Sequence, residues 1–346
     1  MDEVRVGSEA RTRRVRLSLS AAVFCAVLAP QSARAQIGCV VTPGTFGSAA
    51  DVCRKADDLF RFLVPQIGVA VSGGNPVPGE GGTMGGWGRR AFSFRAVVVD
   101  GYVPDNTVPL NLTGSAVASD FGAARTPVPL PSIDAAIGLT RGIPFGLTNI
   151  GGVDLLVGAS ALPKVTTGSL QIEPKGNGGV AFSFGARVGL LQESSVFPGV
   201  SVSYMQRKLP TVDLGYTPGN DTLRVAGTSV KSQSIRLVAS KRLPIVGFAI
   251  GVGRDNIEGS SQVSAVVNET VLGTAQRATV SVPLLAEKIS RNTAFVNLSL
   301  NLVFARLVAE AGWSSAGEKR PTLNTFGGRT ANEGYRYGSL GLTTRF

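Results

Sequence analysis

The chain has 346 residues, of which 43% are hydrophobic and only 16% are charged, below the roughly 25% charged residues of a typical soluble domain. Lys and Arg number 34 against 23 Asp and Glu, for a formal net charge of +11. The low charge argues against disorder and against an ordinary cytosolic enzyme. There is no histidine, which excludes a Ser-His-Asp triad, a Cys-His pair and any His-ligated metal site.

The first 35 residues have the pattern of a secretory signal peptide. Four arginines (Arg11, Arg13, Arg14, Arg16) precede an apolar stretch from Leu17 to Leu28, which is too short to cross a bilayer. Ala33-Arg34-Ala35 predicts cleavage before Gln36. A start site placed too far upstream, or a retained anchor, is the alternative. Cleavage leaves 28 basic and 20 acidic residues, a net charge of +8.

Two cysteines, Cys39 and Cys53, remain after cleavage, and Cys25 leaves with the signal. In an oxidising compartment an even number of cysteines favours a disulfide. In the chain-entropy model, a Cys39–Cys53 bridge would stabilise the folded state by roughly 3 kcal/mol. Two buried free thiols are the alternative.

One amphipathic helix is predicted near the start of the mature chain. Ser48 can cap it, residues 49–63 carry an apolar stripe, and Pro65 is expected to end it. Asp57 and Asp58 are expected on its solvated face. The Gly-rich stretch 68–88 that follows predicts a loop or a compact plug, and 67–72 is a possible extra strand.

Alternation with a period of two fills the rest of the chain, and this is the signature of β-strands. In residues 294–304, for example, Val, Leu and Phe alternate with Asn and Ser. About a dozen such segments are predicted, at 91–101, 132–141, 150–161, 179–192, 198–207, 230–241, 244–255, 260–267, 276–284, 293–304, 306–314 and 335–346.

Many amphipathic strands form either a soluble β-sandwich or a transmembrane barrel whose apolar face meets lipid. The export signal, strands near 10–14 residues, a polar face of Gly, Ser and single charges, and short turns alternating with long connections favour the barrel. The predicted fold is therefore all-β: an antiparallel transmembrane barrel of 12 or 14 strands (residues 89–346) with an N-terminal helical plug (residues 36–88).

The last strand, "YRYGSLGLTTRF", ends the chain in Phe346. In this it resembles bacterial outer-membrane β-barrel proteins, whose final strand carries an assembly signal that ends in an aromatic residue. Ser339, Gly341 and Phe346 match that pattern, whereas Thr344 stands where the family has a hydrophobic residue. The resemblance implies the outer membrane as location, with its lipid and the barrel-assembly machinery as partners.

The order of the parts resembles a narrower family, the outer-membrane long-chain fatty-acid transporters. Those proteins have an N-terminal plug and an Asn-Pro element before the first strands. Here Gly73-Gly74-Asn75-Pro76 precedes "RRAFSFRAVVV". The match covers about thirty residues, and Asn-Pro is also an ordinary turn signal.

Single charges alternate with apolar residues in the predicted strands and are therefore expected to point into the lumen. They form either a charged constriction that selects solutes or a network of ion pairs that stabilises a narrow barrel. These candidate lumen charges are Arg95, Arg187, Arg236, Arg306, Asp134, Asp154 and Glu310. The helix stripe is expected to pack into the barrel mouth against Gly247, Gly251 and Gly253 or their neighbours.

Other chemistries have little support. The segment 79–88 is Gly-rich but lacks the Lys-Ser/Thr of a phosphate-binding P-loop. No basic cluster with interleaved aromatics predicts nucleic-acid binding. No enzyme activity, cofactor or metal site is expected. The function predicted is a porin-like channel or transporter for a small solute, with two alternatives: a structural or surface-interaction barrel with a closed lumen, and a soluble exported β-sandwich.

Overall fold

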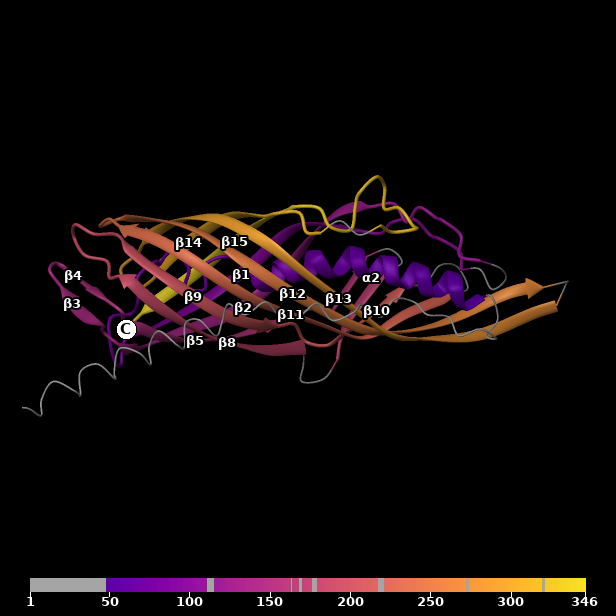
Figure 1. Cartoon of the computed structure of the whole chain (residues 1–346), viewed down its shortest axis with the longest axis horizontal. Coiled ribbons are helices and arrows are strands. Elements are labelled where there is room, and N and C mark those ends of the chain that lie inside the picture. Colours follow the sequence, from indigo (N-terminus) through magenta and orange to yellow (C-terminus); the bar gives the residue numbers. More distant parts are fainter. Residues whose placement is uncertain are drawn as a thin grey trace, which may run out of the picture. The chain divides into compact units, whose positions relative to one another are not determined.

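A computed structural model describes residues 48–346 except 111–114, 163, 168–169, 176–178, 217–220, 272–273 and 319–320. The predicted signal peptide and Cys39 lie outside the described residues. Within them, the main feature is a closed antiparallel barrel of ten strands (Figure 1). Its strands are β1 (Arg90–Val103), β2 (Ala124–Thr140), β5 (Val153–Ala161), β8 (Val180–Leu191), β9 (Gly199–Lys208), β11 (Thr222–Arg242), β12 (Val246–Val271), β13 (Thr274–Asn301), β14 (Arg306–Ser314) and β15 (Tyr335–Arg345).

The barrel closes where the first strand pairs with the last. β1 and β15 are antiparallel over Ala91↔Arg345 to Val99↔Tyr337. At the far side of the sheet β11 pairs with β12 along nearly its whole length. Every strand of the ring therefore has two neighbours, although the part of β13 before Thr293 extends past β14 and pairs only with β12.

The predicted count of 12 or 14 strands was wrong, because two pairs of predicted strands are single long strands. The segments 244–255 and 260–267 both belong to β12, and the segments 276–284 and 293–304 both belong to β13, except for the turn residues at their ends. The two strands pair from Val246↔Leu300 to Val271↔Thr274.

The polarity of the two strand faces inverts partway along β12, and this is why the pattern seemed to break. Near the start of the strand the outward residues are apolar, as at Phe248 and Ile250, and the inward ones are small. Further along, the inward residue Ile257 is apolar and fully buried, whereas the outward residue Arg254 is charged and exposed. The period of two continues, but the apolar residues change faces.

Further strands extend the sheet on one side. β10 (Val212–Tyr216) pairs with β11, then β7 (Leu170–Pro174) with β10, and β6 (Val165–Thr167) with β7. A small separate hairpin, β3 (Ile143–Phe145) and β4 (Thr148–Ile150), lies in the connection between β2 and β5.

The two ends of the barrel differ in their connections. At the end that contains Arg90 and Arg345, the turns between β8 and β9, β11 and β12, and β13 and β14 are short; we call this the short-turn end. At the opposite, long-loop end, residues 104–123 and 315–334 form long connections, and the paired strands β12 and β13 extend outward.

Helix α2 (Ser48–Ser72) lies inside the barrel, where it contacts β11, β13, β1 and β12 (Figure 1). The prediction that Pro65 ends the helix was wrong, as was the possible strand at 67–72. Proline inside a helix costs about 3 kcal/mol, but Val64 and Ile67 beside it are buried, and this packing offsets the lost hydrogen bond. No helix in the described part of the chain is long and apolar enough to cross a membrane.

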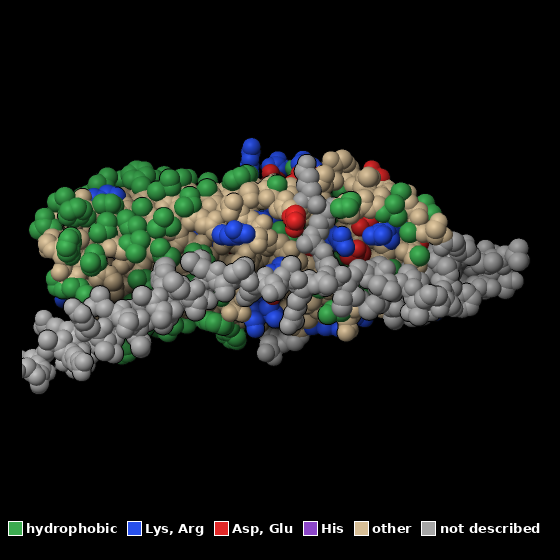
Figure 2. Space-filling view, viewed as in Figure 1, with side chains coloured by type: hydrophobic (Ala, Val, Ile, Leu, Met, Phe, Trp, Pro, Cys, Tyr) green, Lys and Arg blue, Asp and Glu red, His purple; other side chains and the backbone are tan. Residues whose placement is uncertain are grey.

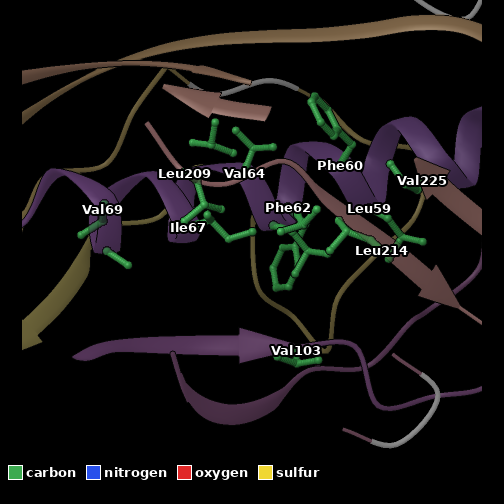
Figure 3. Close-up of a cluster of buried hydrophobic side chains, with 14 of the residues drawn as sticks. Leu59, Phe60, Phe62, Val64, Ile67, Val69, Val103, Leu209, Leu214 and Val225 are labelled. Atoms are coloured by element: carbon green, nitrogen blue, oxygen red, sulfur yellow. The ribbon is translucent and has the colours of Figure 1, made fainter. Parts of the chain in front are cut away.

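The apolar side of α2 packs into a hydrophobic core at the long-loop end. In Figure 3, Val64 lies beside Leu209, and Leu59 lies near Leu214 and Val225. The helix approaches β12 closely at two glycines. A Cβ on Gly259 would lie 2.7 Å from Val64, and a Cβ on Gly68 would lie 2.5 Å from Ile257. The expected contact with Gly247, Gly251 and Gly253 was wrong, since the helix packs further along the same strand.

The two long loops close over α2, and we call them together the loop clasp (described residues of 104–123 and 315–334). Phe326 stacks on Phe62 with ring centroids 4.1 Å apart. Asp58 Oδ2 accepts hydrogen bonds from the backbone N–H groups of Leu323 (3.0 Å) and Asn324 (3.0 Å) and from Asn324 Nδ2 (2.8 Å). Asp57 forms an ion pair with Arg61 at 2.9 Å. The expectation that Asp57 and Asp58 lie on a solvated face was wrong, because both are buried.

Exposed apolar side chains cover the outside of the barrel near the short-turn end. Figure 2 shows them over the end that contains β3, β4 and the C-terminus, whereas charged side chains gather over the other half. Phe94, Phe182, Ile250, Leu298 and Leu340 are each more than half exposed. Aromatic and aliphatic groups in this arrangement form the apolar belt that a membrane barrel turns to lipid.

Placing a charge on the belt tests that assignment. We expect Leu298→Arg to block membrane assembly, because Arg at the bilayer midplane costs about 2–4 kcal/mol. Ser290→Arg lies on the same face of β13, beyond the belt, and should assemble normally. The measurement is the yield of heat-modifiable, membrane-embedded protein; equal yields would contradict a lipid-facing Leu298.

The clasp should depend on Asp58. Burial raises the pKa of the Asp58 carboxyl above its ordinary value, so the folded state binds this proton more tightly than the unfolded chain. Ionisation of Asp58 therefore lowers the free energy of unfolding as pH rises from about 3.8 through the folded pKa.

We expect Asp58→Ala, which removes three hydrogen bonds, to expose residues 321–334 to protease. Asp58→Asn keeps an acceptor oxygen and should expose them far less. Equal cleavage of both variants and the wild type would contradict the clasp.

Candidate functional site: the polar lumen

Inside the belt the lumen is polar, and a segment without regular secondary structure fills it. This plug segment (residues 73–88) follows α2 and leads into β1. All of its residues from Gly73 to Gly86 are buried. The wall around it carries Ser and Gly together with a small number of charged side chains.

The wall charges are paired. Asp134 lies between two arginines, with Arg95 Nε at 3.2 Å and Arg207 Nη1 at 2.9 Å. Arg187 Nη2 lies 2.7 Å from Asp154, and Arg236 Nη2 lies 2.6 Å from Asp255. All seven side chains are nearly inaccessible. Such charges require partners, because an isolated charge buried away from water costs several kcal/mol.

Asn75 connects the plug segment to the wall through both its side chain and its backbone. Its Nδ2 donates to Asn297 Oδ1 (3.0 Å) and to the carbonyl of Glu80 (3.1 Å), and its Oδ1 accepts from Val77 N (3.2 Å). Its backbone N–H donates to Glu310 Oε2 at 2.9 Å, and its carbonyl accepts from Arg95 Nη1 at 2.9 Å. The Asn75 side-chain amide therefore stabilises the turn at residues 75–80, and Glu310 and Arg95 of the wall bind the Asn75 backbone.

Glu80 brings a carboxylate to a group of wall arginines. Its Oε1 lies 3.2 Å from Arg306 Nη1, 3.3 Å from Arg242 Nη2 and 3.4 Å from Arg345 Nη1. These arginines come from β14, β11 and β15, which meet at the short-turn end. One acid of the plug segment therefore offsets the mutual repulsion of three cations.

The plug segment also approaches the wall backbone closely. Gly81 N donates to Ser240 Oγ at 2.8 Å, and a Cβ on Gly81 would lie 2.6 Å from the backbone nitrogen of Ser240. Further on, Met84 N donates to both oxygens of Asp154 at 3.0 Å. Only glycine fits position 81 without moving the plug segment or the wall.

The structure places all seven sequence-predicted lumen charges in the interior, and each contacts either another wall residue or the plug segment. Arg306 contacts Glu80, and Glu310 accepts from Asn75 N and from Asn297 Nδ2 at 2.6 Å. The network also contains residues that sequence reasoning missed. Asp255 and Arg207 have the inward parity of their strands and could have been found from it; Asn75 and Glu80 lie in an irregular segment that gives no such signal.

The remaining predicted residues lie at the seam and in the helix. Ser339 points inward, and Phe346 is exposed, packing edge-to-face on Phe92 with centroids 6.3 Å apart. Phe346 also exchanges backbone hydrogen bonds with Arg90. Their part in assembly remains a prediction. Cys53 is disulfide-bonded, but since Cys39 lies outside the described residues, the Cys39–Cys53 pairing also remains a prediction.

A cavity of about 540 Å³ opens at the short-turn end, beside the plug segment. Its lining is polar and comes from the plug segment (Glu80, Thr83) and from the wall (Gln192, Glu193, Arg242, Arg345). Thr83 Oγ1 donates to Gln192 Oε1 at 2.6 Å, which fixes one side of the cavity. In the described part of the chain no three acidic or cysteine side chains are grouped closely enough to hold a metal ion.

Comparison with known proteins assigns the chain to no family. No family model and no curated protein matches this chain. Among solved structures it is similar to the translocator domain of the autotransporter NalP from Neisseria meningitidis, with 13% identity, coverage of 75% of this chain and 89% of that one, and a TM-score of 0.35. It is also similar to the β domain of the Bordetella autotransporter BrkA (12% identity, 75% and 98% coverage, TM-score 0.30). A Pseudomonas aeruginosa FadL homologue is similar at 7% identity, 75% and 90% coverage and a TM-score of 0.23.

The closed antiparallel barrel and its apolar belt are those of an outer-membrane protein, and the chain is located in the outer membrane. The kinship with fatty-acid transporters suggested by the Asn-Pro element is not established, because the FadL homologue matches only weakly.

Adding one methyl group at Gly81 tests the docking of the plug segment. We expect Gly81→Ala to displace the segment from the wall, because its Cβ would overlap backbone atoms of Ser240 and Gly199. Gly82→Ala is the matched control, since its Cβ would have no neighbour nearer than 3.4 Å. Limited proteolysis of residues 73–88 measures the effect, and equal protection of the two variants would contradict the close approach.

Proposed function

We propose that this outer-membrane barrel passes a small polar solute and that the structure is its closed form. The observation that carries the proposal is the contrast between the two halves of the lumen. At the long-loop end the chain fills its interior with an apolar core. Inside the belt it uses buried ion pairs and hydrogen bonds, which often stabilise a fold less than apolar packing of the same volume. A polar lining across the membrane suits a solute path.

The plug segment is the part best suited to move. It has no regular secondary structure, and polar contacts rather than apolar packing hold most of it. It also borders the cavity at the short-turn end. Helix α2, in contrast, is embedded in the apolar core and forms a second barrier further along. Passage therefore requires displacement of the plug segment and, because α2 continues directly into that segment, a coupled shift of α2. The proposal includes no catalytic step and no cofactor.

The orientation follows from the usual arrangement of such barrels, in which short turns face the periplasm and long loops face outward. On this basis the cavity beside Glu80 opens to the periplasm and the loop clasp lies on the cell surface. The clasp then separates the polar lumen from the exterior.

A second candidate function is a surface-interaction barrel with a permanently closed lumen. The observation that favours it is the large structure beyond the belt, where β10, β7 and β6 extend the sheet and the clasp covers α2. In that case the polar network serves only to fix the plug segment, and no variant that frees the segment should yield a selective path.

Removing the Glu80 carboxylate separates the two candidates. We expect Glu80→Ala to release the plug segment, because loss of one partner of a buried ion pair costs about 3–5 kcal/mol. Single-channel conductance in planar bilayers should show open events at least about tenfold more often than in the wild type. The open state should favour anions, since Arg242, Arg306 and Arg345 then have no opposing acid on the plug segment.

Glu173→Ala is the matched control, because Glu173 forms an exposed pair with Lys164 at the protein surface. It should leave conductance unchanged. If folded Glu80→Ala protein shows wild-type conductance while residues 73–88 become protease-sensitive, the plug segment moves without opening a path, and the closed-lumen function is favoured.

A further inference from the structure

The turns at the short-turn end carry large apolar side chains at their tips. Val303 and Phe304, between β13 and β14, are 88% and 89% exposed. Ile245 lies between β11 and β12, Val196 between β8 and β9, and Phe145 in the β3–β4 hairpin, and each is about two-thirds exposed. We call these five residues the apolar rim. Turns that face water are normally polar, so the rim requires an explanation.

On some strands the outward apolar run is too short for a membrane. On β12 the outward apolar residues run only from Val246 to Val252, and the next outward residue is Arg254. At about 3.3 Å rise per residue and a tilt of about 40°, this run covers about 15 Å. A membrane barrel has an apolar band about 25 Å tall. β1 shows the same limit, from Phe92 to Val98 with Asp100 beyond. On β8, in contrast, the outward apolar residues run from Val180 to Leu190 and cover about 25 Å. The belt is therefore short on β1 and β12, and there the missing height lies at the rim.

Backbone carbonyl groups of the rim turns accept hydrogen bonds from polar side chains of the barrel strands. Asn301 Nδ2 donates to the carbonyls of Leu243 (2.9 Å) and Pro244 (3.3 Å). Lys241 Nζ donates to the carbonyls of Ser194 (2.7 Å) and Ser195 (2.8 Å). Turns in water do not need such partners, whereas turns in an apolar layer do, because each unsatisfied carbonyl there costs several kcal/mol.

Exposed basic side chains accompany the rim. Arg89, Arg90 and Arg141 are exposed at the short-turn end. Arginine side chains reach from an apolar layer to headgroup phosphates, and anionic lipids attract them. The positive charges of these arginines complement the phosphate headgroups of a phospholipid leaflet.

We infer that the apolar rim is immersed in the phospholipid leaflet at the short-turn end and completes the belt where strands such as β1 and β12 leave it short. The turns extend the apolar surface past the strand ends, Asn301 and Lys241 satisfy their carbonyls, and the arginines bind the headgroups. The inference rests on the outer-membrane location and not on solute passage.

Fluorescence quenching at the rim tests the inference. In a background of Trp87→Phe and Trp313→Phe, we place a single tryptophan at Phe304 and reconstitute the full chain in phosphatidylcholine and phosphatidylglycerol vesicles. Lipids brominated in their acyl chains should quench Phe304→Trp about as strongly as a belt control, Leu298→Trp, and acrylamide in water should quench it weakly. Ser290→Trp, beyond the belt, should show the reverse. Strong acrylamide quenching of Phe304→Trp with little quenching by brominated lipid would overturn the inference and leave a periplasmic protein as the partner of the rim.

Bilayer thickness provides a second, independent test. The double variant Val303→Asp and Phe304→Asp should fold as well as the wild type in detergent and in thin bilayers of twelve-carbon lipids. In eighteen-carbon bilayers its folding yield should fall several-fold, because the shortened belt no longer matches the membrane. Leu284→Asp, an exposed outward position on β13 beyond the belt, is the control and should fold equally in both. A thickness-independent yield for the rim variant would count against the rim as part of the belt.

Discussion

A small closed barrel must fill its own interior, and the rest of this structure depends on how it does so. Ten strands enclose a space that the chain occupies with one helix and one irregular segment. Outside the membrane the filling is apolar, and the wall turns Val, Leu and Ile inward onto α2. Within the membrane the apolar residues are needed on the outside, so the wall turns Ser, Gly and charges inward. The polarity of each long strand therefore inverts at the edge of the belt.

This inversion explains what the sequence could and could not predict. The alternation identified an antiparallel barrel with an N-terminal helix, because the period of two is visible wherever one face is apolar. It overcounted the strands, since at Arg254 and Ile257 the apolar residues change faces and one strand reads as two. Pro65 was taken as a helix end because local propensity predicts it; burial on all sides, a tertiary effect, overrides that propensity.

The lumen was predictable only where it is built from strands. Inward parity identified the seven candidate charges, and the same parity extends to Asp255 and Arg207. It could not show that Asp134 serves two arginines, since that depends on which strands are neighbours. Nor could it show that Glu80 lies among Arg242, Arg306 and Arg345, because an irregular segment has no periodicity and its partners come from distant parts of the chain.

The path of the chain through the barrel constrains how the molecule is made. Helix α2 begins at the long-loop end, against the clasp, and the plug segment ends at the short-turn end, where β1 begins. The segment made before the first strand thus runs the length of the lumen. The ring closes where β15 pairs with β1, so the first and last strands of the ring meet beside the point at which the plug segment enters the wall. Closure of this one seam therefore also encloses the plug segment and α2, and the order of the wall and of its filling depends on the same contact.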